Sequence, residues 1–196
     1  MNIEEFILAK GTEHQYAVFH DMDRRELVHK QLWSILIDYF FIGGMPEAVQ
    51  SWIDSKAQTT LTRRHMVRQI QKDILQGYER DFGKYSGKIN ALHISQVFNN
   101  VVTQLQKNID GNTKRFIFKD VIEKKSSYRD FSNIIDWLEK THLISKCYVI
   151  TEKPRVPLRA IRKENFFKLL FLDIGLLCCE SRMNESALDM GNMLFK

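Results

Sequence analysis

The residues of this 196-residue chain that could do chemistry fall short of known nucleotide-binding motifs. A P-loop needs G-x-x-x-x-G-K-[ST], because its backbone N–H groups cradle phosphates and its hydroxyl holds Mg²⁺. Gly77 and Gly83-Lys84 come near that pattern, but five residues separate the glycines and Tyr85 replaces the hydroxyl. Asp81-Phe82-Gly83 spells the metal-binding tripeptide of kinases, without the glycine-rich or catalytic-loop signatures that accompany it. The sequence therefore predicts no ATP site.

Metal and nucleophile chemistry has as little support. Glu123-Lys124-Lys125 matches the E-x-K half of a metal-dependent nuclease motif, in which carboxylates hold the cation. That motif needs neighbouring strand residues, whereas these three lie at the predicted end of a helix, so we interpret them as a solvated charge run. The six histidines show no H-E-x-x-H spacing, and no G-x-S-x-G signature is present. We expect no cofactor, no metal and no catalysis from these residues.

Composition indicates a globular chain that does not cross a membrane. The three Trp, six Tyr and thirteen Phe need a packed core, and 27% charged residues is too few for a disordered chain. The two most apolar stretches are Leu32–Met45 and Phe166–Cys179, and charged residues interrupt both before they reach the ~20 apolar residues of a spanning helix. An odd set of three cysteines favours a reduced, cytoplasmic protein.

The first half of the chain predicts helices. Capping residues and apolar periodicity place them at Ile3–Ala9, from Asp21 or Asp23 to the Gly43-Gly44 pair, at Pro46–Ile53, from Thr59 or Thr60 past Tyr78, and at Ile89–Leu105. Glycine ends a helix because it reaches the left-handed conformation without a Cβ clash, and Pro46 opens the next helix because its missing N–H costs nothing there. The expected inward side chains include Leu27, Leu32, Ile35, Leu36, Tyr39, Phe40, Leu61, Val67, Ile70, Ile74, Tyr78, Leu92, Phe98, Val101, Val102 and Leu105.

The pattern changes after Lys114. We expect a short segment, two helices and a β-hairpin, at Phe116–Phe118, Lys119–Lys125, Tyr128–Thr141, Cys147–Ile150 and Phe166–Leu172. The basic loop Thr151–Arg162 joins the two strands. This order is a winged-helix layout in which the loop is the wing. Asp173 then caps a further helix, and Gly175 permits close packing there.

These elements predict a mainly α fold with a helical N-terminal subdomain, a winged-helix subdomain and a tail, at residues 1–112, 113–180 and 181–196. The boundary follows the turn signal of Asn108–Asn112. Basic charge is concentrated in the second part: Lys114–Lys163 holds thirteen Lys or Arg against six Asp or Glu, a net charge of +7, while the remainder balances at −2. The candidate nucleic-acid contacts are Arg129, Lys140, Lys153, Arg155, Arg159, Arg162 and Lys163.

Two segments carry a more specific signal. Tyr39-Phe40-Phe41-Ile42-Gly43-Gly44-Met45-Pro46-Glu47-Ala48-Val49 resembles the "Y-L-x-x-G-G-M-P-E-A-V" signature of predicted bacterial and archaeal AAA-type P-loop ATPases. Pro157-Leu158 and Phe167–Leu177 are similar to the same family's "P-L … F-K-L-Y-L-x-D-x-G-L-L". Tyr78–Tyr85 and Trp137–Ile144 fit two further motifs in the same order, "Y-x-x-D-F-x-K-Y" and "W-L-x-x-x-x-L-I".

The resemblance implies the C-terminal region of those ATPases, a domain of unknown function. Family members carry a P-loop domain upstream of a segment like Ile3–Ile7 and a nuclease-like domain downstream, and neither is expected among these residues. We therefore expect a fragment of a longer protein or the product of a truncated gene. On this interpretation Gly43, Gly44, Pro46, Asp173 and Gly175 are structural residues.

Two functions remain open on the sequence. The first is a non-catalytic module that binds double-stranded DNA weakly and with little sequence specificity, because its basic residues cluster on the expected wing while the Tyr128–Thr141 helix is mixed in charge. The second is a protein-interaction module that relays the state of an ATPase domain to a partner or to a C-terminal domain. An autonomous enzyme ranks last.

Overall fold

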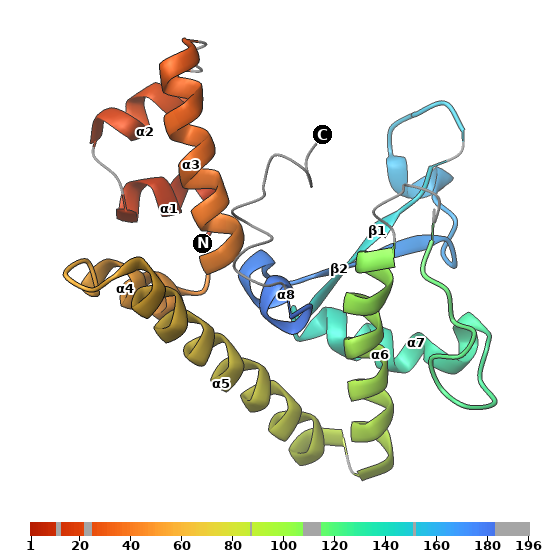
Figure 1. Cartoon of the computed structure of the whole chain (residues 1–196). Helices are drawn as coiled ribbons and strands as arrows, with labels where there is room; N and C mark the ends of the chain where they lie inside the picture. The colour runs from red at the N-terminus through yellow and green to blue at the C-terminus, as the bar shows by residue number, and fades with distance from the viewer. Residues whose placement is uncertain (11–12, 22–24, 87, 108–114, 151, 183–196) are drawn as a thin grey trace. The chain divides into compact units, whose positions relative to one another are not determined.

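The computed structural model describes residues 1–10, 13–21, 25–86, 88–107, 115–150 and 152–182. They form two compact units, whose elements are labelled in Figure 1. The first unit comprises Met1–Gln76 and the described part of Asp173–Lys196, and the second comprises Gly77–Leu172. This grouping places the helix that precedes residue 108 with the second half of the chain, whereas the sequence assigned it to a subdomain at 1–112. The predicted boundary at Asn108–Asn112 and residues 183–196 of the predicted tail lie outside the described residues.

Every regular element in the described part of the first unit is a helix, and its first helix has a reciprocal cap. Helix α1 (Ile3–Lys10) begins where the Asn2 side chain accepts the Glu5 N–H at 2.9 Å and the Glu5 carboxylate accepts the Asn2 N–H at 2.7 Å. This capping box gives hydrogen-bond acceptors to two backbone N–H groups that have no partner within the helix, and it confirms the predicted helix start. The other helices of the unit are α2 (Glu13–His20), α3 (Glu26–Ile42), α4 (Pro46–Asp54), the first part of α5 (Thr60–Ser86) and α8 (Ile174–Glu180).

The prediction of one helix from Asp21 or Asp23 was wrong in its start. The chain forms α2 first, which no prediction covered, and α3 begins only at Glu26. Leu27 is 71% exposed, and the buried residues of α3 are Val28, Ile35, Phe41 and Ile42. Of the predicted inward residues, Ile35 is buried and Leu32, Tyr39 and Phe40 pack against the core, so the prediction fails at Leu27, where Val28 is buried instead.

The first unit is held by one hydrophobic core. Helices α1, α3, α4 and α5 contribute to it, and its members are Phe6, Ile7, Ile35, Phe41, Ile42, Ala48, Val49, Trp52 and Val67. Leu61, a predicted inward residue of α5, is exposed instead. The Arg63 guanidinium lies 3.7 Å from the Trp52 ring and donates to the Trp52 carbonyl at 2.7 Å. Helices α4 and α5 are thus joined by apolar packing and by this stacked cation.

The second unit combines the last part of α5, from Gly77 onward, with two further helices and a two-stranded antiparallel sheet. Its elements are α6 (Lys88–Lys107), α7 (Tyr128–Lys140), β1 (Ile144–Tyr148), the 3₁₀ turn η2 (Leu158–Ile161) and β2 (Phe167–Phe171). The register pairs Ile144 with Phe171 and Tyr148 with Phe167. The mainly helical fold with a small hairpin is as predicted. Strand β1 begins three residues before the predicted run because the chain turns directly after α7, where the Leu143 N–H bonds the Leu138 carbonyl.

The predicted helix at Lys119–Lys125 is wrong. The segment forms tight turns joined by an isolated bridge between Ile122 and Lys125. Asp120 and Lys124 have φ of 64° and 61°, and left-handed residues of this kind interrupt a right-handed helix. Seven residues also close too few turns to offset helix nucleation, so burial of Val121 and Ile122 decides the local structure.

Aromatic side chains form the core of the second unit. Phe82 packs edge-on against Phe98 at 5.5 Å and against Trp137 at 5.7 Å between ring centroids. Phe98 of α6 in turn lies 4.7 Å from Phe171 of β2. Each such pair adds about 1 kcal/mol beyond the area that it buries. Leu92, expected to point inward, is exposed.

None of the helices in the described ranges combines the length and the apolar character needed to cross a membrane.

Candidate nucleic-acid interface

The loop between β1 and β2, described at residues 149–150 and 152–166, presents most of the predicted contact residues. Lys153, Arg155, Arg159 and Lys163 are all exposed there. The Arg155 guanidinium lies 4.0 Å from the Glu152 carboxylate, a long pairing, and both side chains are largely in solvent. Exposed pairs of this geometry contribute little, so these cations remain available to an anionic partner.

Arg162 differs from its neighbours in the loop. Its guanidinium lies 4.1 Å from the Tyr148 ring, and its Nε donates to Glu164 at 3.0 Å. Only 21% of its side chain is exposed. The hydrogen bond to Glu164 raises the pKa of Arg162 above its ordinary value. Arg162 therefore anchors the loop to β1, a role that no pattern in the sequence indicates.

The other two predicted contacts lie on α7. Arg129 and Lys140 are both exposed and are eleven residues apart, which puts them on one side of the helix about 16 Å from each other. Asp136 lies on the same side between them. The helix therefore presents two cations separated by a carboxylate. This stripe suits contact with two phosphates better than contact with a continuous anionic surface.

Lys146 of β1 neutralises the acidic side of α7. Its ammonium lies 2.5 Å from Asp136 and 3.0 Å from Glu139, and its side chain is 4% exposed. Burial alone would lower the pKa of Lys146, but the hydrogen bonds to the two carboxylates outweigh that and hold the pKa above its ordinary value. Two of the three acidic side chains that make α7 mixed in charge are thus paired within the unit.

A hollow of about 340 Å³ beside α7 adds two cations that the prediction missed. Arg115 and Lys119 line it together with Ser126, Ser127 and Asn165. Both basic residues are exposed, and Arg115 lies 5.5 Å from the Phe166 ring. They fall inside the basic window Lys114–Lys163, but nothing in their spacing singles them out.

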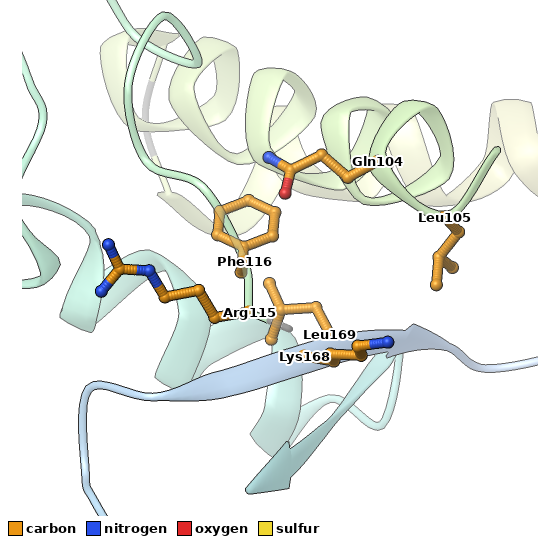
Figure 2. Close-up of a pocket in the computed structure, with 6 residues that line it drawn as sticks. All are labelled: Gln104, Leu105, Arg115, Phe116, Lys168 and Leu169. Atoms are coloured by element: carbon orange, nitrogen blue, oxygen red, sulfur yellow. The ribbon is translucent and has the colours of Figure 1, made fainter. Parts of the chain in front are cut away.

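The segment 116–118 joins the sheet without being a strand. The Phe116 N–H bonds the Phe167 carbonyl at 2.7 Å, and the Gln104 side chain pairs with Ile117 on the opposite side, accepting its N–H at 2.9 Å and donating to its carbonyl at 2.7 Å. Figure 2 shows Gln104 on α6 directed at this segment, above Leu169 of β2. The cavity there, about 10 Å³, holds at most one water, so it is no ligand site.

The predicted structural residues meet at one junction in the first unit. Gly43 ends α3 with φ of 77°, and Pro46 opens α4. Asp173 caps α8 by accepting the Leu176 N–H at 2.9 Å, and its second oxygen accepts the Gly44 N–H at 2.6 Å. A Cβ on Gly175 would lie 2.5 Å from the Ile42 carbonyl oxygen. The capping and close packing predicted for Asp173 and Gly175 are confirmed.

Two residues of α5 complete the junction and were missed. Gln71 is fully buried and donates from its amide to the carbonyls of Phe41 and Ile42, each at 3.0 Å. Arg68 lies 3.8 Å from the Phe41 ring and donates to Gln71 at 2.6 Å and to the Gly175 carbonyl at 3.2 Å. They satisfy carbonyls left open at the end of α3. A polar residue on the apolar side of a predicted helix was the available signal.

The two segments that resemble catalytic motifs in the sequence lie within a helix and an exposed turn. Asp81-Phe82-Gly83 is in the interior of α5, where Phe82 is a core residue. Glu123 and Lys124 lie in an exposed turn and pair with each other at 3.7 Å. Among the residues that the structure describes, no three His, Cys, Asp or Glu side chains are grouped as a metal site would require.

Comparison with known proteins identifies one family. No curated protein and no solved structure matches the chain. A family described as a domain of unknown function, DUF8612, matches residues 34–187. The match spans both the Gly43-Gly44 turn and the Asp173 turn, so it contains the whole junction described above. The chain therefore belongs to the DUF8612 family.

Proposed function

We propose that the unit Gly77–Leu172 is a non-catalytic winged-helix module that binds nucleic acid weakly through phosphates. The observation that carries the proposal is the exposed set of cations on the β1–β2 loop, Lys153, Arg155, Arg159 and Lys163. Proteins gain most of their nonspecific affinity for DNA by neutralising phosphates with such residues.

The order of the elements supports the winged-helix arrangement. Helix α6 comes first, the 116–118 segment bonds to β2, α7 follows, and the β1–β2 hairpin carries the basic loop. On this proposal, the 116–118 segment adds to the small sheet at the edge of β2. The proposal requires the turns at 119–125 to take the place of the middle helix.

The charge pattern supports phosphate contact over base contact. On α7 only Arg129 and Lys140 are basic, and Asp136 lies between them. Contacts to phosphates position a protein on a duplex, whereas sequence is read by side chains that reach base edges. We therefore expect affinities in the micromolar-or-weaker range at physiological salt, with little preference among sequences.

The test is direct binding of the chain to a random duplex. Fluorescence anisotropy at about 50 and 200 mM salt gives the affinity and its salt slope. We expect measurable binding at the lower salt, with a log–log slope of a few units. No binding at the lower salt would reject the proposal.

A second candidate function rests on the first unit. Five large apolar side chains are exposed among its described residues, at Met1, Leu8, Leu27, Leu61 and Met66. Exposed apolar residues of this kind mark protein contacts when they gather on a surface. Together with the resemblance in sequence, they support a module that couples an AAA-type ATPase domain to a partner. Mixing this chain with such an ATPase domain and measuring both association and ATP hydrolysis tests that alternative.

A further inference from the structure

The tip of the β1–β2 loop combines apolar and basic side chains in a way that the fold does not require. Val156 is 94% exposed and Leu158 is 51% exposed. Pro157 lies between them, and Arg155 and Arg159 flank the three. None of these side chains is buried in a core. An apolar pair at a projecting turn, bracketed by two arginines, points to a partner.

The base of the loop is held in place. The Val149 N–H bonds the Phe166 carbonyl at 3.1 Å where the strands end. Ile161 of η2 is buried, and Arg162 stacks on Tyr148. The Ala160 N–H bonds the Pro157 carbonyl at 3.0 Å and closes the turn at the tip. The tip is therefore presented by a fixed base, which lowers the ordering cost of inserting it into a partner.

We infer that this tip enters the minor groove of duplex DNA, an inference that rests on the proposed nucleic-acid binding. Val156 and Leu158 would contact the sugar walls and base edges, and Arg155 and Arg159 would contact the flanking phosphates. The minor groove is about 6 Å wide, so it admits one turn of extended chain but not a helix. Apolar side chains that enter it unstack base steps and bend the duplex.

Charge complementarity favours this occupant over a lipid surface. A narrow apolar strip between two cations matches a groove whose sugar walls are apolar and lie between two rows of phosphates. Stable membrane association needs a wide apolar face or a lipid anchor, whereas only Val156, Pro157 and Leu158 are apolar at this turn. Lipid binding is therefore an outcome that the experiment distinguishes.

The experiment compares Val156→Ser/Leu158→Ser with the control Leu170→Ser. Leu170 is also an exposed apolar residue of the second unit, but it lies at the end of β2 away from the loop. Binding to short A·T-rich and G·C-rich duplexes is measured by anisotropy, and bending by energy transfer between dyes at the duplex ends. We expect the loop variant to bind roughly tenfold more weakly and to lose the bend, while its salt slope stays unchanged. The control should match the parent.

The outcomes separate the two proposals. If the parent binds duplex DNA and the loop variant binds and bends it equally well, the tip inference is wrong and the phosphate contact stands. If the parent binds no duplex at low salt, both fall. If anionic phosphatidylserine vesicles bind the parent but not the loop variant, while duplex DNA binds neither, the tip contacts lipid and the inference is overturned. Urea unfolding checks that the double variant Val156→Ser/Leu158→Ser is folded. If its fold is altered, the single variant Val156→Ser is used in its place.

Discussion

The carboxylate of Asp173 accepts the backbone N–H of Gly44 at 2.6 Å, although 129 residues separate the two in sequence. The same carboxylate caps α8 through the Leu176 N–H. One side chain therefore satisfies the start of α8 and the turn that follows α3. This bond connects the two segments that carry the strongest sequence resemblance, and it gives both a structural explanation.

Replacing Asp173 should destabilise the first unit. Asp173→Ala removes a helix cap and leaves the Gly44 N–H without its acceptor, and we expect a loss of about 2 kcal/mol in the free energy of unfolding. Asp173→Asn keeps one acceptor oxygen and should cost about half as much. Urea unfolding followed by circular dichroism measures both. If the parent and the alanine variant unfold with equal free energy, the two hydrogen bonds that Asp173 accepts do not stabilise the unit, and the prediction is wrong.

The glycines of the chain should divide into two classes. Gly43→Ala forces a Cβ onto a residue with φ of 77° and against Asp173, so we expect a loss of about 1 kcal/mol or more. Gly175→Ala should also destabilise, because its Cβ would meet the Ile42 carbonyl. Gly83→Ala is the matched control: open space surrounds that position within α5, and alanine should stabilise the helix by up to about 1 kcal/mol. Thermal melts rank the three variants.

Lys146→Met should affect both stability and DNA binding. Removing the ammonium leaves Asp136 and Glu139 uncompensated, and because both carboxylates are half exposed we expect a loss of about 1 kcal/mol. The same change removes one positive charge and leaves the Asp136 and Glu139 carboxylates unpaired near Arg129 and Lys140, which should weaken binding to duplex DNA. Asp136→Asn is the opposite test and should strengthen it. Affinity measurements at one salt concentration check the expected order, in which Asp136→Asn binds duplex DNA most tightly, the parent less tightly and Lys146→Met least.

His93 should make the second unit less stable in mild acid. Burial, and then the nearby Lys125, lower the pKa of His93 in the folded state below the ordinary 6.5. The unfolded chain therefore binds the proton first, so stability is full above about pH 6.5 and falls as the pH drops toward the folded pKa. The Lys125 ammonium lies 3.5 Å from the ring nitrogen Nδ1. His93→Gln should flatten this part of the pH profile. An unchanged profile in urea titrations between about pH 7 and 5 would contradict the assignment.

Sequence reasoning recovered the elements whose signals are local. The Asn2 cap, the Gly43 stop, the Pro46 start and the Asp173 cap all lie within a few residues of the groups that they satisfy, and all four are present. These predictions needed only backbone chemistry.

The failures depend on distant partners. Val121 and Ile122 adopt turns because the unit buries them, and propensity does not report burial. Gln71 is a polar residue on the apolar side of α5, but the carbonyls that it caps lie about 30 residues away, so no local pattern identifies its partners. In the candidate interface, six of the seven predicted cations are exposed as expected, whereas the aromatic ring that holds Arg162 could be found only in three dimensions.

The salt dependence of DNA binding tests the proposed phosphate contact most directly. The parent is compared with Arg155→Ala/Arg159→Ala and with Lys56→Ala/Lys72→Ala, which removes two exposed cations from the first unit. Both variants lose the same charge, so a nonspecific effect of net charge changes them equally. We predict that the log–log salt slope falls by about two units in the loop variant and stays close to the parent value in the control. Equal slopes in all three proteins would contradict the assignment of the β1–β2 loop as the contact surface.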